Sequence, residues 1–315
     1  MRDPLSARSI VPVENPEPYR SSSRQPKWWL NLVLLLLTLA TTTVYGAAVT
    51  VTFYANQPID TELIWAAYRL VAHADPVLLQ GLWFSLPLLT ILMAHELGHY
   101  VACIRWQVDA TLPYFLPSPF LLGTFGAFIR IKSPIYTRRS LFDIGVSGPI
   151  AGFLVLVPVL AVGIFLSRSI PNIAARGDFV FGTPLLIRIM ELARFGPHIP
   201  TSDIALHPVA QAAWAGLLAT AINLLPIGQL DGGHILYALL GPVHRTLSRV
   251  FLAVLLPMGY FSYSWLFWAV VLFFLGVRHP LVYDDMPLDG KRKVIAMAAF
   301  VILVLSISLT PVRLR

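Results

Sequence analysis

The chain has 315 residues, of which 57% are hydrophobic and only 12% carry a charge. A soluble globular domain normally has about 25% charged residues, so this composition excludes a single soluble domain and indicates an integral membrane protein. The formal net charge is +7, but the basic residues are not interleaved with aromatic residues as in a nucleic-acid groove, so we expect no nucleic-acid partner. The single cysteine, Cys103, excludes an intramolecular disulfide framework and a cysteine-rich zinc site.

Residues 1–27 are polar and basic and are predicted to form a cytoplasmic tail. Residues 28–315 are predicted to form a single membrane-embedded domain, because apolar stretches follow that are long enough to cross about 30 Å of hydrocarbon. The expected fold is therefore an all-α polytopic membrane protein with about six transmembrane helices. The apolar stretches are Trp28–Phe53, Val77–Ile104, Ile144–Leu166, Pro208–Leu240, Val250–Val277 and Val294–Leu309.

Two of these stretches contain helix breakers. Pro226, Gly228, Gly232 and Gly233 interrupt the fourth stretch, and a proline and a glycine near residue 258 interrupt the fifth. Broken helices at membrane depth occur where protein or a water-filled cavity covers the freed backbone, so the fourth stretch is a candidate for a functional site. The positions of Lys and Arg around the stretches favour an orientation with both chain ends inside.

The second stretch ends in an H-E-x-x-H motif, in which His95 and His99 flank Glu96. On an α-helix, residues i and i+4 face the same way, so the two imidazoles can bind one Zn²⁺ while the glutamate reaches a zinc-activated water as general base. The alternative is a chance match of five residues. Three ionisable side chains near bilayer depth are costly without compensation, and a shared metal ion supplies that compensation.

A catalytic zinc site needs a third protein ligand besides His95 and His99. Asp231 lies among the glycines of the fourth stretch, where backbones can approach closely, and its carboxylate suits that role. Read alone, Asp231 is also a good N-cap for the second half of a broken helix. Both interpretations stay open at this point.

H-E-L-G-H in one apolar stretch and N-x-x-P-x-x-x-L-D-G-G in a later one resemble the site-2 protease family of intramembrane zinc proteases. The resemblance covers a catalytic core of about residues 77–240. It implies one Zn²⁺ per chain, held by His95, His99 and Asp231, with Glu96 as general base. It also implies that Asn223 helps to hold the substrate or the developing oxyanion. This chain has no room for the PDZ domain that many bacterial members carry.

The segment from Gly123 to Ile131 is rich in aromatic and β-branched residues. It resembles the membrane-edge strand by which family members clamp an unwound substrate, so Gly126 and Phe128 are candidate substrate-binding residues. The alternative is an ordinary hairpin at the membrane interface. A small membrane-edge β element is expected in either case.

Small residues at the start of the third stretch, residues 143–152, are expected to pack against the catalytic helix. His234, His244 and His279 have no motif partner and are interpreted as structural or interfacial, with His234 alone worth reconsidering because it lies three residues from Asp231.

The sequence therefore predicts a zinc metalloendopeptidase that hydrolyses a peptide bond of transmembrane protein substrates within the lipid bilayer. The first alternative is a zinc-site membrane protein without proteolytic activity, acting as a chaperone or binding partner; an intact Glu96 argues against it. A di-iron lipid-modifying enzyme needs several histidine clusters, whereas one pair here has ligand spacing. A transporter is not supported, because no inverted repeat is visible. The bacterial plasma membrane is the expected location, with a plastid membrane as the alternative.

Overall fold

The computed structural model describes residues 28–59, 61–71, 73, 75–275, 282 and 286–314. The tail predicted for residues 1–27, and His279, lie outside the described residues.

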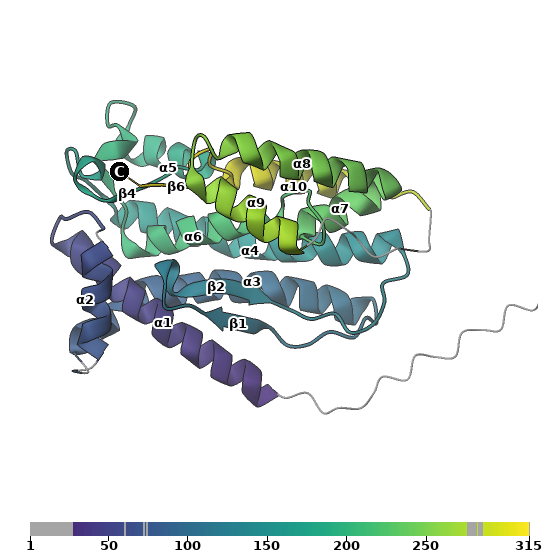
Figure 1. Ribbon diagram of the computed structural model, residues 1–315, viewed down its shortest axis with the longest axis horizontal. Coiled ribbons are helices and arrows are strands. Elements are labelled where there is room, and N and C mark those ends of the chain that lie inside the picture. The colour runs from purple at the N-terminus through teal and green to yellow at the C-terminus, as the bar shows by residue number, and fades with distance from the viewer. Residues whose placement is uncertain are drawn as a thin grey trace, which may run out of the picture.

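Most of the described chain is helical, and the long helices lie side by side in one bundle (Figure 1). The helix α2 stands across one end of the bundle, and the hairpin β1–β2 lies along α1 and α3. The α-helices are α1 (Trp28–Tyr54), α2 (Thr61–Val71), α3 (Leu82–Arg105), α4 (Arg138–Leu166), α5 (Leu185–Phe195), α6 (Pro208–Asn223), α7 (Asp231–Leu240), α8 (His244–Met258), α9 (Tyr263–Leu275) and α10 (Gly290–Ser306). The 3₁₀ turns are η1 (Pro76–Gly81), η2 (Leu121–Gly123), η3 (Ala174–Arg176), η4 (Thr201–Asp203) and η5 (Gly241–Val243).

Four helical segments among the described residues are long and apolar enough to cross a membrane: Trp28–Tyr54, Pro76–Arg105, Arg138–Leu166 and Asp231–Met258. The first three agree with predicted stretches. The fourth segment is not one straight helix but turns back on itself at η5. The contact between Ser248 on α8 and the backbone just before α7 shows this reversal. The prediction of about six spans is therefore not confirmed, since α6, α9 and α10 have only 16, 13 and 17 residues.

The predicted β element is one of three small antiparallel sheets in the described chain, each with two strands. The predicted segment forms β1 and β2. The other two sheets, which the sequence analysis did not predict, join connections that follow α4 to later parts of the chain. The strands are β1 (Tyr114–Pro117), β2 (Thr124–Phe128), β3 (Arg168–Ser169), β4 (Phe179–Phe181), β5 (Ile204–Ala205) and β6 (Val312–Leu314), paired as β1–β2, β3–β5 and β4–β6.

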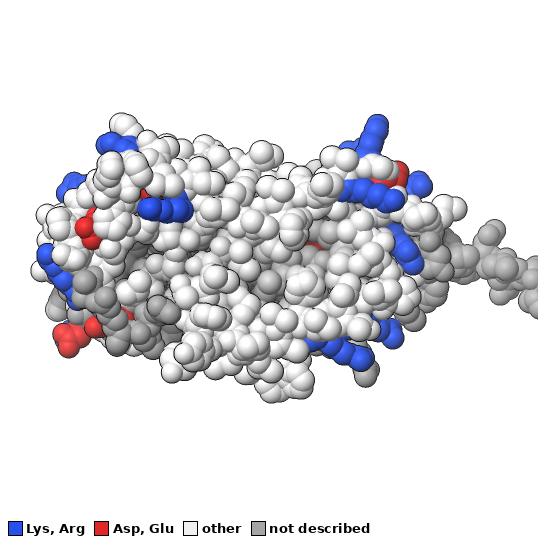
Figure 2. Space-filling model, turned by 90° about the horizontal axis from the view of Figure 1, so that it is seen from above, with Lys and Arg blue, Asp and Glu red and all other residues white. Residues whose placement is uncertain are grey.

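The two ends of the bundle differ in charge. In Figure 2, charged side chains gather at both ends and leave a wide band between them that is almost free of charge, as expected for the part of a protein that faces lipid. The end of α3 lies at the same end of the bundle as the starts of α4, α8 and α10, and these termini are rich in basic residues. We call this the basic end; its basic residues are Arg105, Arg138, Arg139, Arg245, Arg249, Lys291, Arg292 and Lys293.

The prediction that both chain ends lie on the same side is wrong for the described residues. The fifth apolar stretch breaks after Pro257 and forms two helices, α8 and α9, that pack against each other. This adds one reversal of the chain. The last strand, β6, consequently lies at the end opposite to the start of α1 (Figure 1). We call that second end the cap end, because α5 and the sheets β3–β5 and β4–β6 close it.

Candidate metal centre

The helix α3 carries the H-E-x-x-H motif in its second half, toward the basic end. His95, Glu96 and His99 are 5%, 5% and 7% exposed, so all three are buried. The two imidazoles face the same way, as the i, i+4 spacing predicts, and their Nε2 atoms lie 3.2 Å apart.

The break in the fourth stretch brings Asp231 to these histidines. The helix α6 ends at Asn223, the chain makes a series of tight turns, and α7 begins at Asp231. Gly228 adopts a φ of +56°, which favours glycine. The residue that caps α7 is Leu230, and no side-chain cap hydrogen bond is formed there. The alternative that Asp231 merely caps the helix is therefore wrong in this structure.

The three side chains form a compact set of ligand atoms. The Oδ2 atom of Asp231 lies 3.1 Å from His95 Nε2, and its Oδ1 atom lies 3.3 Å from His99 Nε2. One ligand atom from each residue lies within 4.8 Å of the other two. Among the described residues, these three form the one cluster of His, Cys, Asp or Glu side chains close enough to share a metal ion. Two imidazole nitrogens and a carboxylate are the donor set of a three-ligand catalytic zinc site with an open position. The residues present therefore fit a zinc ion.

A hydrogen bond from the other imidazole nitrogen fixes the orientation of His99. Its Nδ1 lies 2.7 Å from the carbonyl oxygen of Ile144 on α4. A carbonyl accepts only, so Nδ1 carries the proton and Nε2 presents a lone pair toward Asp231 and His95. Such a bond sets the tautomer that a metal ligand needs.

Glycines on α4 let this helix approach the metal ligands. A Cβ atom at Gly148 would lie 2.1 Å from His99 Nε2, and one at Gly152 would lie 3.1 Å from the Cβ of His95. On α3, a Cβ at Gly98 would lie 2.5 Å from the carbonyl oxygen of Ser147. The structure agrees with the prediction that the small residues of this segment pack against the catalytic helix.

Glu96 lies beside the ligand set without belonging to it. Its carboxylate interacts electrostatically with both histidines and Asp231, and it accepts a hydrogen bond from the backbone N–H of Ile129. Ile129 directly follows β2, so the hairpin reaches the carboxylate.

The other predicted site residues lie at different distances from the ligands. Asn223 Nδ2 lies 3.3 Å from His95 Nε2, at the end of α6. Gly126 and Phe128 lie on β2; Gly126 has a φ of +104°, and Phe128 stacks on Tyr114 across the hairpin with ring centroids 5.5 Å apart. His234 lies on α7 but is not a member of the metal-ligand group among the described residues.

Sequence reasoning missed a serine that holds the broken segment. Ser248 Oγ on α8 accepts from the N–H of Gly228 at 3.3 Å and donates to the carbonyl of Pro226 at 3.2 Å. His244 Nε2 lies 3.0 Å from the same oxygen. These contacts satisfy backbone groups that the break frees at membrane depth. The only sequence signal was the spacing of four between two polar residues, His244 and Ser248, on a helix.

A second missed group joins three helices near the basic end. Arg292, at the start of α10, donates from Nε to Asp143 Oδ1 at 2.8 Å and from Nη2 to Oδ2 at 2.6 Å. Trp106, which follows α3, donates to Asp143 Oδ2 at 3.1 Å. Asp143 immediately precedes Ile144, so this ion pair anchors the part of α4 that orients His99. Asp143 and Arg292 are 149 positions apart, so no local sequence pattern could predict that they pair.

The sequence model of Peptidase family M50 matches residues 83–266, which is more than half of the chain and includes every predicted site residue. The chain belongs to this family. The match begins near the start of α3 and ends in α9, so the metal centre lies inside it.

Curated relatives have similar sequences. The probable zinc metalloprotease EGY1, chloroplastic, of Arabidopsis thaliana is 35% identical over 184 residues, which cover 57% of this chain and 32% of the relative. EGY1 of Oryza sativa subsp. japonica is 37% identical over 160 residues, covering 49% of this chain and 27% of the relative. EGY2 of Arabidopsis thaliana, also named a probable chloroplastic zinc metalloprotease, is 30% identical over 287 residues, which cover 90% of this chain and 48% of the relative. The chain thus spans less than half the length of these relatives. No solved structure matches.

Proposed function

We propose that this protein is an intramembrane zinc metalloprotease that hydrolyses a peptide bond of transmembrane protein substrates. The observation that carries the proposal is the convergence of His95, His99 and Asp231 beside a buried glutamate in a family of peptidases. The relatives are named as zinc metalloproteases, which supports zinc as the metal.

His95, His99 and Asp231 would hold one zinc ion per chain. When bound, zinc acts as a Lewis acid that polarises a peptide carbonyl and makes water more acidic. Glu96 stands next to the ligands and takes the proton from the attacking water as general base. Its buried position, 5% exposed, keeps bulk water from competing for the carboxylate.

Asn223 is proposed to stabilise the negative charge that develops on the carbonyl oxygen. Its Nδ2 is an amide donor that lies 3.3 Å from a ligand nitrogen, so it is within reach of the reacting carbonyl. An amide held at the end of a helix needs little reorganisation during the reaction.

The hairpin is proposed to hold the substrate in extended form. Strand β2 pairs only with β1 in its two-stranded sheet, so its second edge has no strand partner among the described residues. We expect an added strand to pair along this edge, and Gly126 leaves room for its approach, since nothing lies within 4 Å of a Cβ built at this position. Because Ile129 contacts Glu96, an extended substrate at this edge is led to the general base.

The charge-free band and the apolar helices support a multi-pass protein in a lipid bilayer. We propose that the shorter helices α6, α9 and α10 complete the crossing together with the longer ones, so that the number of passes is close to the six or so expected from the sequence. The basic end would face the inner side of the membrane. The chloroplastic relatives favour a plastid membrane over the bacterial plasma membrane that the sequence alone favoured.

The test compares the wild type with Glu96→Gln after reconstitution into lipid vesicles with tagged single-span peptides. Both proteins should bind about one zinc per chain, because Glu96 is not a ligand. Only the wild type should release cleaved peptide, and cleavage in ¹⁸O-labelled water should place the label in the new carboxyl group. Cleavage by Glu96→Gln, or a wild type that lacks zinc after reconstitution with the metal, would contradict the proposal and favour the non-proteolytic alternative.

A further inference from the structure

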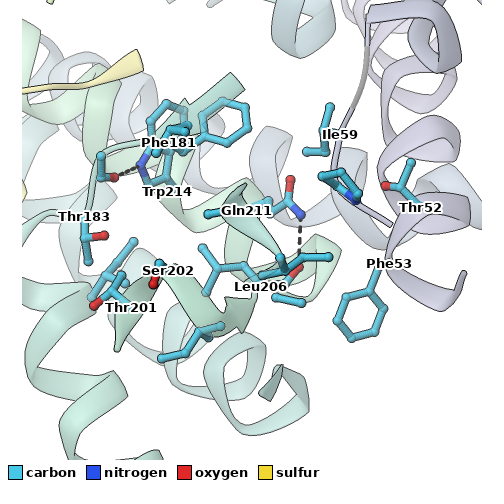
Figure 3. A pocket seen from close by; sticks show the side chains of 18 of the residues that line it. Thr52, Phe53, Ile59, Phe181, Thr183, Thr201, Ser202, Leu206, Gln211 and Trp214 are labelled. Atoms are coloured by element: carbon cyan, nitrogen blue, oxygen red, sulfur yellow. Dashed lines mark hydrogen bonds between the residues drawn. The ribbon is translucent and has the colours of Figure 1, made fainter. Parts of the chain in front are cut away.

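A cavity of about 260 Å³ lies at the cap end of the bundle, remote from the metal centre. It is enclosed by the end of α1, the starts of α3 and α6, and the segments of the cap (Figure 3). Phe84 on α3 lines it, and His95 lies 11 residues further along the same helix, which is roughly 16 Å. The cavity therefore does not belong to the proposed catalytic site.

Most of the wall is hydrocarbon. Aromatic and aliphatic side chains from α1, α3, α5 and α6 surround the space, and Figure 3 shows Phe53 and Ile59 facing Phe181 and Trp214 across it. Buried members of this wall are Tyr45, Phe53, Ile59, Phe84, Ile187 and Trp214. Such a wall suits an apolar ligand, and a few fixed polar groups then set its orientation.

One buried polar side chain of the wall is already paired, and another polar side chain offers a hydrogen-bond acceptor to the space. Glu191 is 1% exposed, and its Oε2 accepts from Thr201 and pairs with Arg188 at 3.6 Å. This carboxylate is therefore already paired inside the wall. Gln211 uses its amide nitrogen to donate to the carbonyl of Leu206, which turns its amide oxygen into the space between Trp214 and Ile59 (Figure 3).

The chemistry of the ligand follows from these groups. A head group that meets the amide oxygen of Gln211 must donate a hydrogen bond, which excludes a carboxylate or phosphate head. The Glu191 carboxylate already has Arg188 as its counter-charge, so a cationic head would be desolvated without a free anion to compensate it. A neutral head with hydroxyl donors meets both conditions.

We propose that this cavity binds a neutral single-chain lipid with a hydroxyl head group, of the monoacylglycerol type. The volume is below the roughly 300–1,000 Å³ of sites that enclose a drug-sized ligand, so it accepts a small head and the first part of one chain, not a two-chain lipid. The cavity lies beside the ends of the apolar helices α1 and α3, where an amphipathic molecule from the bilayer would have a short path to it.

The occupant would also contact the hairpin. Leu122, in the connection between β1 and β2, lines the cavity and adopts a φ of +68°, a strained conformation for leucine. Its neighbour Gly123 is held against α1, where the Thr41 hydroxyl donates to its carbonyl at 2.7 Å. Strand β2 starts at the next residue and leads to Ile129 and Glu96. A ligand that packs against Leu122 therefore holds the strand that lies next to the general base.

The experiment uses the zinc-loaded, full-length chain in phosphatidylcholine nanodiscs and a photoreactive monoacylglycerol. Label is expected in peptides that cover residues 173–214, and unlabelled 1-oleoylglycerol should compete with it better than oleate or oleylamine at the same concentration. Equal or better competition by either charged lipid, or label spread over lipid-facing helices without saturation, would overturn the proposal.

Two matched variants test the location. Ala205→Phe fills the cavity from β5, and Ala298→Phe makes the same change at an exposed position on α10. Saturable label should fall about tenfold in the first, equivalent to about 1.4 kcal/mol of binding, and stay unchanged in the second. The zinc content of each variant, about one per chain, shows independently that it is folded. Full labelling of a zinc-loaded Ala205→Phe protein would overturn the site.

Hydrogen exchange tests the contact with the hairpin. With 1-oleoylglycerol present, backbone amides of residues 114–128 should exchange about fivefold more slowly, and Ala205→Phe should remove the difference. Binding without slower exchange would overturn the link through Leu122. Neither measurement requires peptidase activity, so the outcome is independent of the proposed function.

Discussion

The helices α3 and α6 each pass through two unlike environments. In the half near the basic end, α3 presents His95 and His99 to Asp231, and glycines bring α4 into direct contact with the imidazoles. In the half near the cap end, Phe84 of α3 and Trp214 of α6 face a cavity. The same bundle is therefore packed closely where three ligand atoms must meet, and packed around a space where large side chains meet.

This difference shows how a membrane bundle fixes distances. Lipid provides no hydrophobic force between helices, so close contact depends on small residues and polar ties. The half of the bundle that holds the metal centre, here called the metal half, has both, in Gly148 and Gly152 and in the hydrogen bonds of Asp143 and Ser248.

The half of the bundle near the cap end, here called the cap half, also has close contacts at small residues, since a Cβ at Gly46 would lie 2.4 Å from the carbonyl oxygen of Gly81 and one at Gly163 would lie 2.4 Å from Ala210 N. It differs in the large side chains beside these contacts, such as Phe84 and Trp214, which line a cavity that a ligand can fill.

The largest effect on zinc affinity is expected from one methyl group in the metal half. Gly148→Ala places a Cβ 2.1 Å from His99 Nε2, so either the imidazole turns away or the two helices separate. Zinc affinity should fall by about 100-fold, the upper range for disturbing the surroundings of a ligand. Metal analysis of the purified protein after dialysis against a zinc buffer measures this.

The control for this prediction is Gly290→Ala at the start of α10, where nothing lies within 4 Å of the new Cβ. Alanine favours a helix more than glycine by about 1 kcal/mol, so neither variant should lose helix stability. Normal zinc binding by Gly148→Ala would show that α4 is not held close to the ligands.

Removal of the metal is the next prediction. A ligand at 1,000 times its Kd adds about 4 kcal/mol to the free energy of unfolding, so a chelator should lower the unfolding temperature of the zinc-loaded protein, and added zinc should restore it. Thermal unfolding in detergent measures the change. Asp231→Asn removes a ligand and is the matched control: a chelator should shift its unfolding temperature little, and an equal shift would argue against Asp231 as a ligand.

Much of the metal half could be predicted from the sequence, because its residues are marked either by their spacing along one helix or by nearby glycines and a proline that break a helix. The i, i+4 spacing places His95 and His99 on one face whatever the tertiary structure, and the glycines and Pro226 mark the break that Asp231 follows. The distance between Asp231 and the histidines depends on helix packing, so spacing alone left the capping alternative open. In the structure the three side chains lie together, and the family match covers all three positions.

The arrangement of the rest depended on reversals that hydropathy does not record. The break near Pro257 was visible, but hydropathy could not distinguish a kink in one span from the two packed helices α8 and α9. Because α8 and α9 are two helices and not one kinked span, β6 lies at the cap end and not at the end expected from the sequence. The two-residue pairing of β3 with β5 lacks any pattern of its own, and the Arg292–Asp143 ion pair joins residues 149 positions apart.

The cap half is expected to lose stability in acid because of His207. His207 directly precedes α6, lies 4% exposed against Phe53 and Trp83, and uses Nδ1 to cap the helix by accepting from Val209 N–H. Burial, with a smaller contribution from Arg168, lowers the pKa of His207 from 6.5 to about 4.

The sign follows from the proton balance. Between pH 6.5 and about 4 the unfolded chain binds a proton at this histidine and the folded chain does not, so stability is full above 6.5 and is lost as the pH falls. The loss is at most about 3 kcal/mol. His207→Asn keeps a capping side chain without the titration, so its unfolding temperature should fall less than that of the wild type between pH 7.5 and 4.5. Equal falls would mean that His207 is not buried as a neutral group.

Burial raises the pKa of Glu191, which acts in the opposite direction because the folded protein then holds its proton to a higher pH. That contribution is the same in both proteins and cancels in the comparison. The difference between them therefore reports on His207 alone.

The smallest effect is expected from Ser248→Ala, which tests whether the metal half needs a polar tie from α8. The change removes the acceptor of Gly228 N–H and the donor to Pro226 carbonyl, at a cost of about 1–2 kcal/mol in the free energy of unfolding. Because these groups lie between Asn223 and Asp231, zinc affinity should also fall by about tenfold. Ser202→Ala removes an exposed hydroxyl at the cap end and should change neither quantity. Loss of stability with unchanged zinc affinity would mean that the broken segment keeps Asp231 in place without α8, and that the close packing of α3 and α4 alone sets the ligand distances.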